Sequence, residues 1–310
     1  MKEITLIIPF LNEEDNIPAL INVLNTFCKK SSFDYEVIFV DDGSSDDSVN
    51  CLSDYKNLTF EARIVKLSKN FGSHAALKAG ISIAKGKFIG FLYSDMQDPV
   101  ELPEKMRNVA EQKQANIVWA TRKSLKSGFI EKMFSGAYAG LMKKYVSPDF
   151  PAKGFDIVLF DQKVKDQLNK NIESNSSIFL QILKMGFKQE RIEYEKEKRN
   201  VGKSKWTYGK KIKLFIDSFV AFSYFPIRMV TVMGIVFFLL GILWTAYIVI
   251  RTLLFHDLEP GWPSLISILM IGFGVTNIGL GIVAEYLWRT LDAARKRPVY
   301  IIDEIINLSE

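Results

Sequence analysis

Two long apolar runs near the end of the chain constrain its architecture more than any other feature. Met229 to Ile250 and Trp262 to Ala284 carry no charged side chain. Each is at least as long as the ~20 residues that a helix needs to cross a hydrocarbon core of about 30 Å. One such run could be a buried helix of a soluble protein, but two in succession favour a transmembrane hairpin. We therefore expect a membrane-anchored chain whose substrate lies in or on the membrane.

Basic residues flank this hairpin on its outer sides. The segments before the first run and after the second run are rich in Lys and Arg, whereas the linker between them, 251–261, is short. Because an excess of Lys and Arg marks the cytoplasmic side, both termini should face the cytoplasm. The first apolar run, Ile4 to Phe10, is too short for a signal peptide and is followed by acidic residues.

Length and charge agree with this view. The chain has 310 residues, enough for one α/β domain and a membrane hairpin, and a net charge of +5. Its basic residues cluster beside the apolar runs, which favours attraction to anionic lipid and disfavours a nucleic-acid partner. Cys28 and Cys51 lack metal-ligand spacing, so we expect ordinary thiols of a reducing compartment.

Before the hairpin, short apolar runs alternate with amphipathic segments. The expected strands are Ile4–Phe10, Tyr35–Val40, Ala62–Leu67, Phe88–Leu92 and Ile117–Ala120, and the expected helices are Ile17–Phe27, Asp47–Tyr55 and Ser73–Ala84. This alternation predicts a mostly parallel sheet with right-handed crossovers. Such sheets bind ligands outside the carboxyl ends of their strands.

Polar side chains follow the predicted strand ends. They are Asn12-Glu13-Glu14, Asp41-Asp42, Lys69-Asn70, and Asp95 with Gln97. Solvated loops alone are the alternative explanation. Four such clusters at one edge of a sheet instead favour a ligand site.

These segments carry a family resemblance. In chain order, the stretches that carry it are IIPFLNEEDNI, VDDGSSDDS, LSKNFGSHAALKAGI, SDMQDPVELP, ATRK and VGKSKW. Together they resemble the motifs of family-2 glycosyltransferases of the GT-A fold, especially polyprenyl-phosphate glycosyltransferases such as dolichol-phosphate mannose synthases and bactoprenol glucosyltransferases. The resemblance covers nearly the whole chain. It implies a Rossmann-like GT-A domain over residues 1–205, a juxtamembrane amphipathic helix over 206–228, two transmembrane helices within 229–289 and a cytoplasmic tail over 290–310.

The resemblance also implies a nucleotide-sugar donor. It assigns Pro9, Phe10 and Glu13 to the nucleoside pocket and Asp41 to the base or ribose. Lys69 follows the third predicted strand, where it contacts the donor phosphate or structures the loop. Helix capping is the alternative role for Asp41, and we expect Asp42 and Gly43 to shape the turn.

Asp95 and Gln97 resemble the metal-binding part of the family's Asp-Ala-Asp-Leu-Gln motif, with Tyr93 in place of its first Asp. The resemblance implies Mg²⁺ or Mn²⁺, hard cations that suit oxygen ligands. Asp98-Pro99, just beyond, predicts the start of a helix.

Arg122 and Asp156 complete the predicted catalytic set with Asp95. The resemblance places Arg122 at the diphosphate or the acceptor and makes Asp156 the candidate catalytic carboxylate, although Val158 replaces an Arg of the family stretch. A phosphate monoester is largely ionised at pH 7, so the acceptor scarcely needs a base. Asp156 then orients the sugar or the acceptor. A strand-edge Asp and a surface Arg are the plain alternatives.

A basic loop precedes the hairpin. By resemblance, Arg199, Ser204 and Lys205 contact the lipid phosphate or the donor diphosphate, and a general polybasic lipid anchor is the alternative. Phe129–Tyr145 and Trp206–Phe225 mix Lys with aromatic residues, as interfacial helices do, although packing helices of the domain would look alike.

The resulting hypothesis is an inverting hexosyltransferase of a bacterial inner membrane. It takes glucose from UDP-glucose to undecaprenyl or another polyprenyl phosphate, for modification of a cell-envelope glycan such as O-antigen. The alternatives are GDP-mannose, UDP-galactose or a UDP-N-acetylhexosamine as donor, and a catalytically inactive membrane scaffold. A processive polysaccharide synthase is disfavoured because no Gln-x-x-Arg-Trp motif occurs. The resemblance and the apolar tail Val299 to Leu308 also suggest a homo-oligomer, with a tetramer as one option, in which the tail pairs with a neighbouring domain's sheet.

Overall fold

The structure is a computed structural model. It describes residues 2–123, 136, 139–144, 147–148, 150–151, 155–171, 177–195, 225–255, 261–295 and 297–308. The chain divides into two compact units, Met1–Ser218 with Pro298–Glu310, and Phe219–Arg297. Each unit is described by itself.

An eight-stranded mixed sheet forms the centre of the first unit, in the order β7-β5-β6-β4-β1-β2-β3-β8. Its strands are β1 (Ile4–Phe10), β2 (Tyr35–Asp41), β3 (Glu61–Leu67), β4 (Phe88–Phe91), β5 (Ile117–Arg122), β6 (Phe155–Asp161), β7 (Gln189–Tyr194) and β8 (Ile302–Asn307). Strand β6 is antiparallel to β4 and β5, and β8 is antiparallel to β3, while the remaining pairs are parallel. The carboxyl ends of β1 to β5 and β7 therefore meet at one edge.

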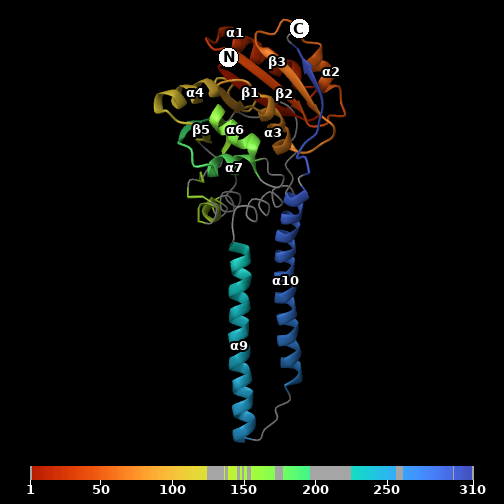
Figure 1. The fold of residues 1–310 in the computed structure, drawn as a ribbon, viewed down its shortest axis with the longest axis vertical. Helices are drawn as coiled ribbons and strands as arrows, with labels where there is room; N and C mark the ends of the chain where they lie inside the picture. The colour runs from red at the N-terminus through yellow and green to blue at the C-terminus, as the bar shows by residue number, and fades with distance from the viewer. Residues whose placement is uncertain are drawn as a thin grey trace. The chain divides into compact units, whose positions relative to one another are not determined.

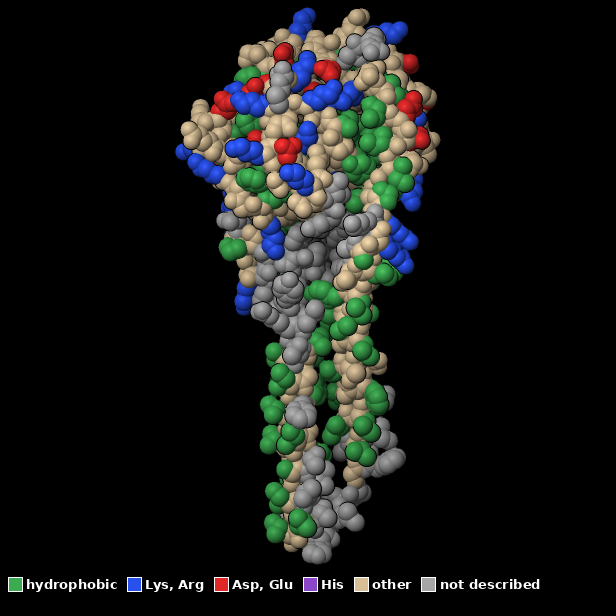
Figure 2. Space-filling view, viewed as in Figure 1, with side chains coloured by type: hydrophobic (Ala, Val, Ile, Leu, Met, Phe, Trp, Pro, Cys, Tyr) green, Lys and Arg blue, Asp and Glu red, His purple; other side chains and the backbone are tan. Residues whose placement is uncertain are grey.

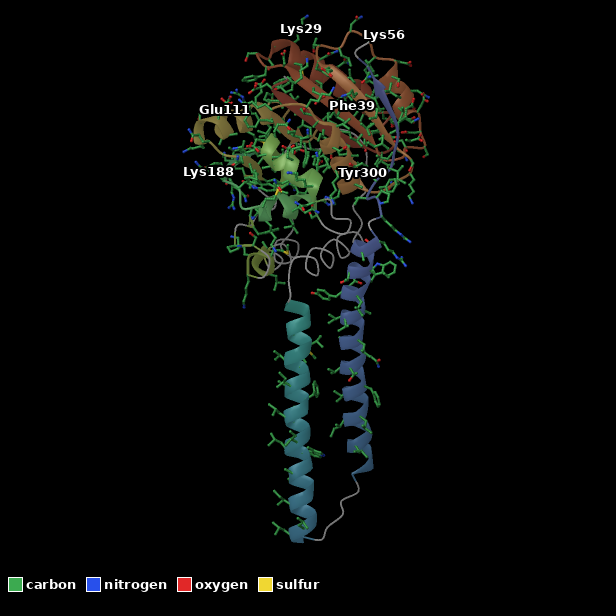
Figure 3. The ribbon with its side chains drawn as sticks, viewed as in Figure 1. Lys29, Phe39, Lys56, Glu111, Lys188 and Tyr300 are labelled. Carbon is green, nitrogen blue, oxygen red and sulfur yellow. The ribbon has the colours of Figure 1, made fainter. Side chains whose placement is uncertain are left out.

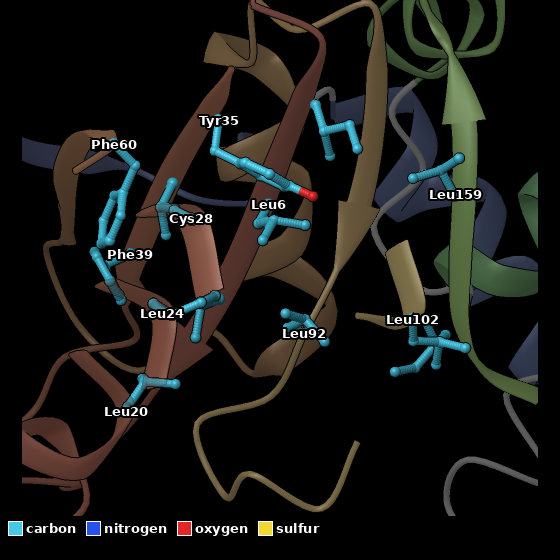
Figure 4. Close-up of a cluster of buried hydrophobic side chains, with 14 of the residues drawn as sticks. Leu6, Leu20, Leu24, Cys28, Tyr35, Phe39, Phe60, Leu92, Leu102 and Leu159 are labelled. Carbon is cyan, nitrogen blue, oxygen red and sulfur yellow. The ribbon is translucent and has the colours of Figure 1, made fainter. Parts of the chain in front are cut away.

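Helices cover both faces of this sheet (Figure 1). They are α1 (Ile17–Lys30), α2 (Ser48–Ser53), α3 (Ser73–Ile83), α4 (Leu102–Lys113), α6 (Gln162–Lys170) and α7 (Ile178–Lys184). Leu24 of α1 and Leu102 of α4 join Leu6 and Phe39 in the core on one face (Figure 4). On the other face α3 packs so closely that a Cβ on Gly80 would meet Ile7.

The five predicted strands and three predicted helices of the amino-terminal part are confirmed, with shifts of a few residues at their ends. One boundary was wrong. Helix α4 begins at Leu102, with Glu101 as its N-cap and Pro103 in its first turn, rather than at Asp98-Pro99. The reason is that the Asp98 side chain is hydrogen-bonded elsewhere, to the Tyr194 hydroxyl.

A buried charge pair lies where the first three strands begin. Glu36, fully buried, accepts hydrogen bonds from Arg63, from the Thr5 hydroxyl at 2.5 Å and from the Lys85 backbone N–H at 2.8 Å. Arg63 is 8% exposed and also donates to the Ile83 carbonyl. A buried charge needs such pairing, so this network fixes β1, β2 and β3 at the edge opposite the predicted site.

The carboxyl-terminal strand β8 closes the other side of β3. Their register pairs Ile64 with Ile306 and Leu67 with Ile302, and Lys66 forms an ion pair of 3.2 Å with Glu304. The predicted pairing of this tail with a neighbouring domain is therefore wrong here, because the tail satisfies the β3 edge of its own chain. Tyr300, labelled in Figure 3, precedes β8.

The second unit consists of two long helices, α9 (Phe225–Phe255) and α10 (Trp262–Arg295), which contain the two predicted apolar runs. A Cβ on Gly279 would lie 3.0 Å from Val230 Cγ1, so the helices touch there. Hydrophobic side chains line both helices in Figure 2. Among the described residues, one stretch, Ile271–Asp292 of α10, is long and apolar enough to cross a membrane, whereas the apolar stretch of α9, Val232–Trp244, is shorter.

Candidate active site

The turns after β1 and β2 are joined by hydrogen bonds. Asn12, with a left-handed backbone at φ 51°, donates its backbone N–H to Ser44 Oγ at 2.9 Å and accepts from the Ser45 N–H at 2.8 Å. The Glu13 N–H donates to Ser48 Oγ at 2.9 Å. These contacts hold two of the predicted polar clusters side by side at the carboxyl edge.

The next pair of turns is joined by Asp42. Its carboxylate accepts the backbone N–H of Phe71 at 2.7 Å and that of Gly72 at 3.0 Å. Burial raises the pKa of Asp42, these hydrogen bonds oppose the rise, and the charge of Asp41 adds to it. Asp41 is 3% exposed and accepts the Ser44 N–H at 2.9 Å. Asp41 thus shapes the turn, whereas the N-cap of α2 is Asp47. The contact of Asp41 with a nucleoside stays a prediction.

Gly43 confirms the prediction that it shapes this turn. Its φ is +76°, and a Cβ there would lie 2.6 Å from the Lys69 carbonyl carbon and 2.7 Å from the Asn70 nitrogen. Both the backbone angle and the close approach require glycine. The turn after β2 therefore lies directly against the loop after β3.

The other predicted donor residues occupy different environments. Pro9 is buried, and Phe10 is 4% exposed and packs in the hydrophobic core at the end of β1. Glu13 accepts from the Asn16 amide at 2.5 Å. Lys69 is exposed, with its ammonium 5.1 Å from the centre of the Phe71 ring. Glu13 and Lys69 lie at the carboxyl edge, and their contacts with a donor stay predictions.

Asp95 and Gln97 lie in the tight turn after β4. The Gln97 N–H donates to Asp95 Oδ1 at 3.4 Å, and Met96 between them has a left-handed φ of 52°. No three His, Cys, Asp or Glu side chains in the described part of the chain gather as a metal cage. A single carboxylate beside an amide instead fits Mg²⁺ or Mn²⁺ whose other oxygen ligands come from a diphosphate and water.

Beside this turn lies a group that the sequence did not predict as a unit. The Tyr194 hydroxyl, at the end of β7, donates to Asp98 Oδ1 at 2.7 Å, and Tyr194 is the register partner of Arg122 at the end of β5. Burial raises the pKa of Tyr93, and the charges of Asp98 and Asp95 add to the rise. Arg122 is therefore brought to the same edge as Asp95, as predicted. Asp98 and Tyr194 were not among the predicted site residues. Tyr194 ends β7, and Asp98 lies in the turn between β4 and α4.

Asp156 lies at the start of β6. The ladder with β5 pairs Thr121 with Phe155 and Ala120 with Ile157, and the irregularity between these pairs leaves Asp156 unmatched beside the end of β5. The backbone thus places Asp156 near Arg122, at the carboxyl edge. Its side chain lies outside the described residues, as do Arg199, Ser204 and Lys205.

The predicted interfacial segments are described only in part. Residues 139–144 are helical, with Met142 fully buried, and Phe225 begins α9.

An open polar hollow of about 930 Å³, lined by Asp34, Glu61 and Lys85 among others, lies at the opposite edge of the sheet, where the parallel strands begin. It contains none of the predicted donor residues.

Comparisons with known proteins decide the family. The family described as "Glycosyl transferase family 2" matches residues 5–156, from β1 to the start of β6. "Uncharacterized glycosyltransferase YkcC" of Bacillus subtilis (strain 168) is 31% identical over 303 residues, which cover 97% of this chain and 93% of that protein. The chain belongs to glycosyl transferase family 2.

Two further relatives have more specific names. "Prophage bactoprenol glucosyl transferase homolog" of Escherichia coli (strain K12) is 30% identical over 312 residues, covering 98% of this chain and 99% of that protein. "Undecaprenyl-phosphate 4-deoxy-4-formamido-L-arabinose transferase" of Proteus mirabilis (strain HI4320) is 27% identical over 315 residues, covering 100% and 96%. Among solved structures, mannosyl-3-phosphoglycerate synthase from Rubrobacter xylanophilus has a TM-score of 0.49 at 12% identity, covering 70% of this chain and 71% of that one.

The family match gives the carboxyl edge a chemical meaning. This family-2 glycosyltransferase places Asp41, Asp95 and Arg122, all within the matched residues, at one edge of its sheet. Acidic and basic groups at such an edge suit a metal-bridged nucleotide sugar. The predicted enzyme class, glycosyltransferase, is confirmed.

Proposed function

We propose that this enzyme transfers a hexose from a nucleotide sugar to a polyprenyl phosphate, with UDP-glucose as the expected donor and undecaprenyl phosphate as the expected acceptor. The observation that carries the proposal is similarity over the whole length to relatives whose names specify bactoprenol and undecaprenyl phosphate. This similarity includes the α9 and α10 region as well as the sheet domain.

The nucleophile of the proposed reaction is an oxygen of the acceptor phosphate. An oxygen of the lipid phosphate attacks the anomeric carbon, the bond from this carbon to the nucleoside diphosphate breaks, and the electron pair leaves with the diphosphate. Attack from the opposite face inverts the configuration. Because the phosphate is largely ionised at pH 7, Asp156 orients the sugar or acceptor and does not have to remove a proton.

Asp95, with the Gln97 amide oxygen, would hold a divalent cation, Mg²⁺ or Mn²⁺. When bound, such a cation supplies positive charge that stabilises the departing diphosphate. Arg122 adds a fixed positive charge at the same edge, and its planar donors suit phosphate oxygens.

Membrane attachment fits both the substrate and the helices. A lipid-linked acceptor requires an enzyme at the bilayer surface, and α10 contains a stretch able to span it. We propose that α9 and α10 form a multi-pass hairpin in a bacterial inner membrane, with both termini and the sheet domain in the cytoplasm. The charge bias of the flanking segments supports this orientation.

The sugar is the open part of the proposal. The two relatives named above act, by name, with glucose and with a modified arabinose. GDP-mannose, UDP-galactose and UDP-N-acetylhexosamines are therefore competing donors, since a few hydrogen bonds in the pocket decide between hexoses.

The test is a transfer assay in membranes that contain the full-length chain, with labelled UDP- and GDP-sugars, undecaprenyl phosphate and Mg²⁺ or Mn²⁺. We expect a lipid-extractable labelled product with one donor strongly preferred. Membranes with Asp95→Asn serve as the control. Absence of product with every donor in wild-type membranes would favour the inactive scaffold.

A further inference from the structure

Three residues from three separate parts of the fold, Arg122, Tyr194 and Asp98, come together at the carboxyl edge. Arg122 ends β5, Tyr194 ends β7, and Asp98 lies in the turn between β4 and α4. The Tyr194 hydroxyl donates to Asp98 Oδ1 at 2.7 Å, and Tyr194 is the register partner of Arg122. Since a guanidinium has only donors, the hydroxyl oxygen that donates to Asp98 is the atom that can accept from Arg122.

The surroundings of the Tyr194 hydroxyl leave it little freedom to move. Tyr194 is 6% exposed and Asp98 is 8% exposed. Arg122 and Tyr194 are register partners in a parallel ladder, and the Lys123 N–H donates to the Tyr194 carbonyl at 2.8 Å. Burial, strengthened by the charge of Asp98, raises the pKa of Tyr194. The Tyr194 hydroxyl therefore stays protonated and donates its hydrogen bond to Asp98.

A guanidinium that is held in one conformation binds a phosphate group more strongly than a mobile one. An arginine side chain loses rotamer freedom when it is held in one conformation. Here Tyr194 and Asp98 hold it before any substrate arrives, and the fork can still present donors to a second group. Such preorganisation strengthens binding to phosphate because the ordering cost is met within the fold.

We propose that Tyr194 and Asp98 are positioning residues that hold the Arg122 guanidinium ready for a phosphate group of the reactants. The inference rests on the proposed function, and the phosphate belongs either to the donor diphosphate or to the acceptor lipid. The competing explanation is that the Tyr194–Asp98 bond only fastens the turn after β4 to β7.

A double-mutant cycle in the full-length enzyme separates these explanations. Tyr194→Phe removes the hydroxyl and keeps the ring, Asp98→Asn removes the charge and keeps the shape, and Arg122→Ala removes the positioned group. We expect Tyr194→Phe to lower kcat/KM by about 10-fold, and to have almost no further effect in the Arg122→Ala background. Asp98→Asn should behave as Tyr194→Phe does. A fastening role predicts losses that multiply, because Arg122 would then be irrelevant to them.

Tyr35→Phe is the matched control. Tyr35 is likewise buried, and its hydroxyl donates to Glu104 at 2.9 Å, but it begins β2 at the opposite edge of the sheet. The Tyr35→Phe variant should lower the melting temperature about as much as Tyr194→Phe does, while leaving kcat/KM unchanged. Equal kinetic losses from the two tyrosine variants would overturn the proposal.

Binding measurements identify the phosphate and do not depend on turnover. Calorimetric titration with UDP and with farnesyl phosphate should show the same non-additive cycle for one of the two ligands. A loss confined to UDP assigns Arg122 to the donor, and one confined to farnesyl phosphate assigns it to the acceptor. Multiplicative losses for both ligands overturn the positioning role, whereas a wild-type enzyme that binds them but transfers no sugar counts against the proposed function alone.

Discussion

The Asp42 carboxylate accepts the backbone N–H of Phe71 at 2.7 Å, and this bond joins the turn after β2 to the loop after β3. Gly43 lies against the same loop, since a Cβ there would be 2.6 Å from the carbonyl carbon of Lys69. The proposed phosphate contact of Lys69 therefore depends on the backbone of the preceding strand's turn.

Replacing Gly43 should disturb both stability and donor binding. Gly186→Ala is the matched control, because Gly186 has φ +73° but no atom within 4 Å of an added Cβ. Both variants incur the left-handed backbone cost of about 1–2 kcal/mol, but only Gly43→Ala must also push the Lys69 loop aside. We expect a clearly larger loss of unfolding free energy for Gly43→Ala and a raised KM for the donor. Thermal melting measures the loss of stability, and donor kinetics measure KM. Equal losses in the two variants would show that the close approach of Gly43 to the Lys69 loop contributes nothing.

Asp95→Asn should reduce transfer by at least about 100-fold, because a metal-held diphosphate is the main source of leaving-group stabilisation. Glu101→Gln, which removes one exposed charge at the N-cap of α4, should change activity little. Chelation with EDTA should abolish wild-type transfer, and Mg²⁺ or Mn²⁺ should restore it. Near-normal turnover of Asp95→Asn would show that Asp95 does not hold the metal.

The sequence predicted the strands of the carboxyl edge because each is a continuous apolar run bounded by polar turns. Ile4–Phe10, for example, is buried along its whole length. The same regularity located Asp42, which directly follows β2, and Asp95, which lies in the turn after β4.

Long-range pairing was beyond such patterns. Tyr194 and Asp98 are 96 positions apart, and nothing local to either marks the other. Asp98 next to a proline resembled a helix start, but its side chain accepts a hydrogen bond from Tyr194 on a distant strand. The tail likewise had an apolar pattern that fitted any open sheet edge, and only the fold shows that β3 of its own chain offers one.

His74 should make stability depend on pH. It packs edge-on against Phe179, with ring centres 5.8 Å apart, and within the described residues its buried Nδ1 has no hydrogen-bond partner. Burial, aided by the charge of Lys78, lowers the pKa of His74 from 6.5 to about 4. The unfolded chain therefore binds a proton that the folded chain excludes, and stability is lost as pH falls from about 6.5 to about 4.

The loss from His74 should amount to ~2–3 kcal/mol across that range. His74→Gln should flatten this part of the stability profile, whereas His256→Gln, at the chain's second histidine, should leave it in place. Chemical unfolding in detergent at several pH values provides the measurement. An unchanged profile in His74→Gln would assign the pH dependence to carboxylates instead.

A soluble form of the sheet domain should need strand β8 as well as residues 1–205. Ending the chain after Lys205 separates the site from the long helices, but it also removes β8, which covers the β3 edge. An uncovered edge strand exposes backbone donors and acceptors and promotes association. We expect fragment 1–205 to aggregate, and fragment 1–205 joined by a flexible linker to residues 298–310 to stay soluble and bind UDP.

Two substitutions in the joined tail test whether strand pairing is the cause. Ile306 packs against the core cluster and Ile305 is 44% exposed. Ile306→Asp should lose about 2 kcal/mol of apolar burial and melt roughly 4–8 °C lower, while Ile305→Asp should change the melting temperature little. Light scattering and thermal melting follow both effects. If the linked tail brings no gain in solubility or melting temperature, or if both Asp variants behave alike, β8 does not stabilise the domain through the β3 edge.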